Sequence, residues 1–169
     1  MAVCRDCGKE LGSTPLVYAA PAPVSYLALP PEEQRKRAEI SSDQCVIDGE
    51  HFFVRANLRI PIAGRDEHFE WGVWTTLSKP NFLRMTDLWQ TPGRETEPPY
   101  FGWLSPELRL VYGQSTINLK THVHTQPVGS RPHVELEHTD HPLAVEQHHG
   151  ITWERVEEIA AILHHADSS

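Results

Sequence analysis

The sequence predicts an α+β fold with a mostly antiparallel sheet, three to four packed helices and an N-terminal Cys-x-x-Cys knuckle. Three observations support this class. Apolar and polar residues alternate over 116–126, which is typical of a half-buried strand. Asp48-Gly49 lies between two apolar runs and predicts a β-hairpin. An apolar stripe at helical spacing over 153–163 predicts a final helix that packs on the sheet.

The N-terminal residues 1–30 are expected to form a knuckle and a Pro-rich arm, attached to an α+β body of residues 31–169. The chain begins with Cys4-Arg5-Asp6-Cys7-Gly8, a spacing common in zinc knuckles because the turn directs two thiolates to one point. The five prolines between Ser13 and Pro31 predict an irregular connector. A chain of 169 residues fits a single globular domain overall.

Local signals place the elements of the body in order. Pro30-Pro31 favours a helix start, since the missing N–H of proline is not needed in the first turn. The hairpin over 43–62 follows, and alternation over 67–75 predicts another strand. Ser78 is suited to cap the next helix. The remaining expected elements are a short aromatic strand or turn over 100–104, strands over 116–126 and 133–138, a helical turn over 141–146 and a helix after Thr152.

The net charge of −8 argues against a general nucleic-acid-binding protein, which would need a basic face for the phosphates. No apolar run is long enough to span a bilayer, so we expect no membrane partner. The first residues lack the apolar core of a signal peptide, and we therefore expect a cytoplasmic protein. A partner is expected to be another protein, and the sequence does not indicate an oligomeric state.

Cys4, Cys7 and Cys45 are the three cysteines of the chain, and in a reducing compartment they favour free thiols or metal ligation over disulfides. A structural zinc ion needs four ligands, and His51 is the residue expected to complete the set. A three-residue loop over 48–50 would place Cys45 and His51 on one face as diagonal neighbours, whereas a two-residue loop would not. The alternative is that Cys45 is a buried apolar residue and that the N-terminal pair holds no metal.

A second polar cluster is expected on the late hairpin. His122, His124, His133 and Glu135 come together if the strands over 116–126 and 133–138 pair. A His-x-His pair with a carboxylate from the next strand can bind a divalent metal or act as an acid–base set. The alternative is a solvated sheet face with cross-strand charge pairs, because polar residues alternate outward on any half-buried antiparallel sheet.

Long motifs across the chain resemble the domain of unknown function 2199 family of uncharacterised bacterial proteins. The resemblance implies a small bacterial protein with no assigned activity. The motifs that carry it are Cys-x-x-Cys-Gly at residues 4–8, Asp43 to Arg55, Phe69 to Trp74, Pro98 to Leu104 and His141 to Gln147.

The sequence holds no nucleophile elbow, phosphate-binding glycine loop or dinucleotide fingerprint. We therefore expect a non-catalytic module that binds another protein, in a regulatory or toxin-neutralising role, and that carries a structural zinc knuckle. The alternative is a metal-dependent enzyme that uses the cluster on the late hairpin.

Overall fold

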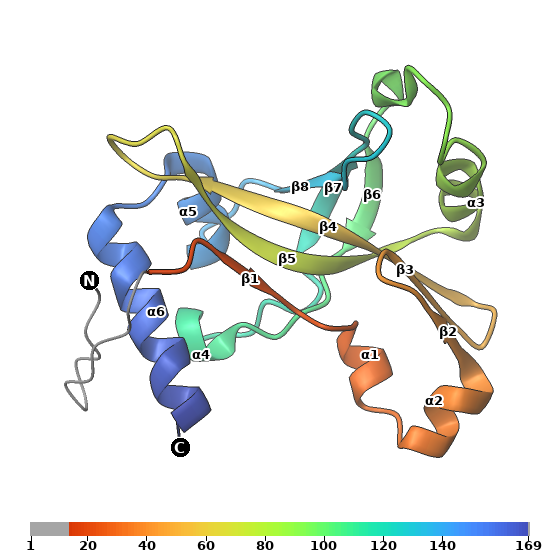
Figure 1. Ribbon diagram of the computed structural model, residues 1–169, viewed down its shortest axis with the longest axis horizontal. Helices are drawn as coiled ribbons and strands as arrows, with labels where there is room; N and C mark the ends of the chain where they lie inside the picture. The colour runs from red at the N-terminus through yellow and green to blue at the C-terminus, as the bar shows by residue number, and fades with distance from the viewer. Residues whose placement is uncertain (1–13, 169) are drawn as a thin grey trace.

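The computed structural model describes residues 14–168, which form one eight-stranded sheet with helices packed against it (Figure 1). The main path of the sheet runs β1-β5-β4-β8-β7-β6, and β2 and β3 extend it from β4. The strands are β1 (Val17–Ala19), β2 (Ala38–Ile40), β3 (Gln44–Ile47), β4 (His51–Pro61), β5 (His68–Leu77), β6 (Tyr100–Trp103), β7 (Lys120–His124) and β8 (His133–Leu136).

The sheet is mixed, so the prediction of a mostly antiparallel sheet was wrong. β1 pairs with β5 in parallel, and β8 pairs with β4 in parallel through Asn57 and His133. The physical reason is that β4 is long enough for two partners along one edge. Its first half pairs with β3 in the expected hairpin, and β8 joins the remainder of that edge from a distant part of the chain.

The sheet curves until its last strand, β6, reaches β5. An isolated antiparallel bridge joins Thr75 to Leu104, and the backbone N–H of Trp103 donates to Thr76 Oγ1 at 2.9 Å. The strands β5-β4-β8-β7-β6 therefore close into a ring. Gly102 makes this approach possible, because a Cβ there would overlap the carbonyl oxygen of Thr76 and lie 2.5 Å from Thr75 Oγ1.

The main hydrophobic core lies on the inner face of the curved sheet. Alternate residues of β4 and β5 point into it, and helices supply the opposite side. α3 contributes Phe82 and Met85, and its first turn is capped by Ser78 as expected. The helices are α1 (Val24–Leu27), α2 (Pro31–Arg37), α3 (Lys79–Asp87), α4 (Arg109–Tyr112), α5 (Pro142–His149) and α6 (Trp153–Ser168).

A smaller apolar cluster lies on the outer face, where the Pro-rich arm covers one end of the sheet. Tyr26 and Leu29 of the arm pack on Cys45, Phe53 and Trp74. The arm is more regular than expected, since it contains β1 and α1. Cys4 and Cys7 lie outside the described residues, and residues 14–168 contain no group of three or more His, Cys, Asp or Glu side chains that could hold a metal ion. The predicted knuckle is therefore not part of the described fold.

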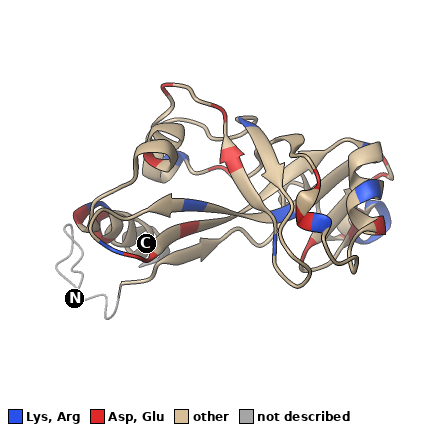
Figure 2. Ribbon diagram, turned by 90° about the horizontal axis from the view of Figure 1, so that it is seen from above, with Lys and Arg blue, Asp and Glu red and all other residues tan. Residues whose placement is uncertain are grey.

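Acidic and basic residues are interspersed over the molecule. Figure 2 shows Lys and Arg segments at both ends of the ribbon, with Asp and Glu segments among them. Within residues 14–168, no helix is both long enough and apolar enough to cross a membrane.

Candidate functional site

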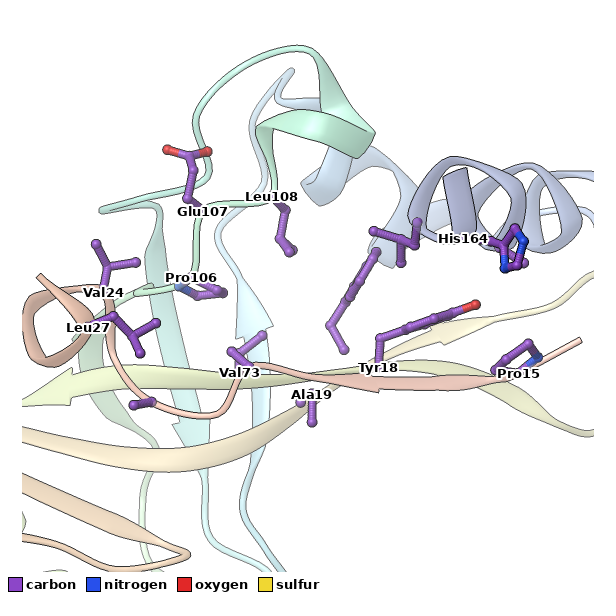
Figure 3. Close-up of a pocket in the computed structure, with 16 residues that line it drawn as sticks. Pro15, Tyr18, Ala19, Val24, Leu27, Val73, Pro106, Glu107, Leu108 and His164 are labelled. Carbon is purple, nitrogen blue, oxygen red and sulfur yellow. The ribbon is translucent and has the colours of Figure 1, made fainter. Parts of the chain in front are cut away.

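A cavity of about 560 Å³ lies between the β1–β5 edge of the sheet on one side and the loop before α4 and helix α6 on the other. Tyr18 and Val73 point toward it from the strands, and Leu108 points toward it from the opposite side (Figure 3). α1 closes one end with Val24 and Leu27. A pocket of this volume with mostly apolar walls is typical of a ligand-binding site.

Glu107 is the acidic residue in the wall of this cavity, and its carboxylate points away from the interior (Figure 3). The carboxylate of Glu107 accepts hydrogen bonds from the backbone N–H groups of Arg109 and Thr116 and from the hydroxyl of Ser115. Figure 3 shows the carboxylate on the side away from Tyr18. The interior of the cavity therefore favours an apolar group.

Strand β1 gives the mouth of the cavity an edge with main-chain groups directed outward. In the parallel pair with β5, Glu70 N donates to Leu16 O at 2.8 Å and Ala20 N donates to Gly72 O at 2.9 Å. Because the pleat alternates, the N–H and C=O groups of Val17 and Ala19 point away from β5. No described strand pairs with that edge, and the Val17 side chain is 57% exposed.

A buried hydrogen bond holds one wall of the cavity in place. Trp71 lines the cavity, and its indole N–H donates to the hydroxyl of Tyr112 at 2.9 Å. Burial and the neighbouring Glu146 raise the pKa of Tyr112, so it stays a neutral phenol. Arg155 Nε donates to Glu146 Oε2 at 2.7 Å beside Tyr112. The hydrogen bond to Tyr112 orients the indole of Trp71 in the cavity wall.

The structure places Cys45 and His51 as the three-residue loop requires. Ile47 is the partner of His51 across the hairpin, and Asp48 and Gly49 both have positive φ. Cys45 and His51 therefore share a face, as diagonal neighbours. Cys45 is 0% exposed and belongs to the outer apolar cluster, whereas His51 is exposed. Within the described fold Cys45 is a packing residue, and its predicted partners in the zinc set, Cys4 and Cys7, lie outside the described residues.

We expect the Cys45 thiol to make the protein less stable in alkali. Burial raises its pKa from 9.0 to about 11, so the unfolded chain loses this proton at a lower pH than the folded one. The contribution of the protonated Cys45 thiol to the free energy of unfolding is fully present below pH 9 and is lost between about pH 9 and 11. Its size is on the order of 2 kcal/mol. Urea unfolding of the parent and of Cys45→Ala across this range measures it. A constant difference between the two proteins from pH 8 to 11 would contradict the prediction.

His122, His124, His133 and Glu135 lie on the outer face of paired strands, as the late-hairpin prediction requires. His122 is opposite Glu135, and His124 is opposite His133. The imidazoles make diagonal contacts with carboxylates, at 3.5 Å from His124 to Glu135 and 3.4 Å from His122 to Glu137. These are half-exposed pairs on a solvated face. They form cross-strand imidazole–carboxylate contacts, and His133 also lines a pocket on this face.

The histidine-rich segment before α6 caps helix α5 and attaches it to the sheet. His141 Nδ1 accepts from the backbone N–H of Leu143 at 3.1 Å, which caps α5, and His141 Nε2 bonds Ser115 O at 2.9 Å. The Gln147 amide accepts from Leu136 N and donates to Val134 O, both at 2.7 Å. Gln147 thus pairs with β8 as a neighbouring strand would. The motif from His141 to Gln147 therefore docks α5 on the sheet.

Residues 3–151 match the family model described as an uncharacterised protein conserved in bacteria (DUF2199). The chain belongs to this family. No curated protein and no solved structure matches it. The resemblance read from the sequence motifs is thus confirmed for this DUF2199 protein, and the family supplies no activity for it.

The cavity is the feature that sequence reasoning missed in this DUF2199 protein. Its walls come from segments far apart in the chain, including the arm, β5, the loop before α4 and the end of α6. One local signal was present. Leu16 to Ala19 is a short run with strand propensity between Pro15 and Pro21, and it forms the edge strand beside the cavity.

Proposed function

We propose that this protein is a non-catalytic binding module that takes an extended, apolar segment of a partner protein at the β1 edge. The segment adds a strand beside β1 and places an apolar side chain in the cavity below it. The observation that carries the proposal is the juxtaposition of an unpaired strand edge with an apolar cavity. Addition of a strand to an exposed sheet edge is a recurrent mode of peptide recognition.

The chemistry of the edge favours a polypeptide over a small molecule or a lipid. The outward N–H and C=O groups of Val17 and Ala19 need hydrogen-bond partners at strand spacing, and a peptide main chain supplies them. The cavity beside the edge has room for one or two large apolar side chains. Main-chain pairing then provides affinity, and the cavity selects the side chain.

A selection from random peptides displayed on phage tests this proposal. We expect enriched peptides to be extended and apolar at alternate positions. Leu27→Glu places a charge at the mouth of the cavity and should weaken their binding by at least about tenfold in isothermal titration. Ala19→Pro removes an outward N–H without touching a bond to β5, and it should have a similar effect.

Ser25→Glu is the matched control, because Ser25 is an exposed neighbour on α1 outside the cavity wall. It introduces the same charge and should leave peptide affinity unchanged. The proposal is overturned if no peptide is enriched, or if the enriched peptides bind Leu27→Glu and Ala19→Pro as tightly as the parent.

A further inference from the structure

A second pocket opens on the outer face of the sheet, on the side opposite the apolar cavity. It has a volume of about 460 Å³. It lies beside β4, between the segment that pairs with β3 and the segment that pairs with β8. Its walls are polar. The residues that line it are Asp43, Asn57, Gly129, Ser130, Arg131 and His133.

Two arginines lie close to one carboxylate at this pocket. Asp43 is the one carboxylate among the lining residues, and its Oδ1 accepts from Arg131 Nε at 2.8 Å. Arg55 lies beside the same pair, since its backbone N–H donates to Asp43 O at 2.9 Å. The charges of Arg131 and Asp43 both act on the Arg55 guanidinium, which lies next to the pocket and is not one of the lining residues.

The charge of Arg55 is incompletely compensated. Its Nε is buried and has no hydrogen-bond partner among the described residues. Burial and the positive charge of Arg131 lower its pKa, and Asp43 offsets this only in part. Burial and the charge of Arg59 likewise lower the pKa of His133, and Glu70 offsets this in part. An anion bound in the pocket beside Arg131 and His133 would favour their charged forms.

Arg94 fixes the loop over 126–131, which forms one side of the pocket. This side chain is 7% exposed and donates to the carbonyl oxygens of Gln126, Pro127 and Ser130 at 2.8–3.1 Å. A rigid loop presents Ser130 and Arg131 in a constant position. Preorganised donors of this kind lower the entropy cost of binding.

We propose that this pocket binds a phosphate group, held by the guanidinium of Arg131 with the support of Arg55, Asn57 and the Ser130 hydroxyl. Guanidinium groups bind phosphate through paired, charge-assisted hydrogen bonds. Asn57 and Ser130 have uncharged donors, which suits an anion with several oxygen atoms. The site is separate from the β1 edge, so the two proposals stand or fall independently.

A titration of the full chain with inorganic phosphate at constant ionic strength, followed by amide NMR, tests the proposal. We expect saturable shifts confined to the amides of Asn57, Gly129, Ser130, Arg131 and His133. Arg131→Gln should weaken the affinity by at least about tenfold. Asn57→Asp adds a negative charge without removing the Asp43–Arg131 pair and should have a comparable effect, which covers the case in which Arg131→Gln perturbs the fold.

Arg35→Gln is the control for the loss of one positive charge, because Arg35 is exposed on α2 and away from the pocket. It should bind phosphate as the parent does. A parallel titration with acetate distinguishes a phosphate site from a general anion site, and equal affinity for acetate would overturn the assignment. So would shifts that fail to saturate, or that are the same in Arg131→Gln and Arg35→Gln.

Discussion

The Arg94→Met variant is expected to lose about 4 kcal/mol of its free energy of unfolding. Arg94 is buried and donates four hydrogen bonds to backbone carbonyls, including Trp89 O at 2.9 Å. Methionine fills similar volume but leaves those carbonyls without donors, and each buried orphan costs about 1–3 kcal/mol, less where water can enter. Urea unfolding monitored by tryptophan fluorescence measures the change.

Arg84→Met provides the matched control for Arg94→Met. Arg84 has the same side chain, but it is mostly exposed and forms a surface ion pair with Glu97 at 2.6 Å. Such exposed pairs contribute little to stability. If both variants lose the same small amount of stability, Arg94 does not hold the loop over 126–130 in the way described.

The Gly102→Ala variant is expected to lose about 3 kcal/mol, because the ring of strands cannot close around a side chain at this position. The added methyl group would overlap Thr76 O, which belongs to the backbone of β5 and cannot turn aside. Displacement of β6 would also strain the buried hydroxyl pair of Thr75 and Thr121, which are 3.0 Å apart, and the bond from Thr121 to Gly102 O. The midpoint of urea unfolding reports the loss.

Gly113→Ala separates this steric effect from the general cost of replacing glycine. Gly113 ends α4 with φ of 74°, and no atom lies within 4 Å of a Cβ built there. Its replacement should cost only the left-handed penalty of about 1–2 kcal/mol. A Gly102→Ala loss no greater than that of Gly113→Ala would argue against a tight contact between β6 and β5.

Much of the local structure followed from the sequence because it depends on neighbouring residues. Asp48-Gly49 marked the hairpin, and both residues adopt the positive φ that this turn requires. Thr121 and Val123 are buried and Lys120 is exposed, as the alternation predicted. The parallel pairing of Asn57 with His133 left no such mark, because it depends on how distant segments approach each other.

The candidate sites also combine features that depend on neighbouring residues, which the sequence predicts, with features that depend on distant segments, which it does not. The shared face of Cys45 and His51 followed from one turn, but the cover that buries Cys45 comes from Tyr26 and Leu29 in the arm. Periodicity could not reveal that cover. The outward face of His122 and His124 was likewise predictable, whereas the cavity beside β1 needs four separate segments of the chain.

The closed ring of strands also constrains the order of folding. Its first strand, β4, needs β8 as a partner, and the chain between them supplies the other three strands. A nascent chain that has released only β4 and β5 has a hairpin with one apolar face uncovered. The ring can therefore form only after β8 is synthesised, and pairing of such distant segments is slow. Until then the open edges and the uncovered apolar face of the hairpin can pair with other chains. We therefore expect this protein to aggregate most readily during its synthesis.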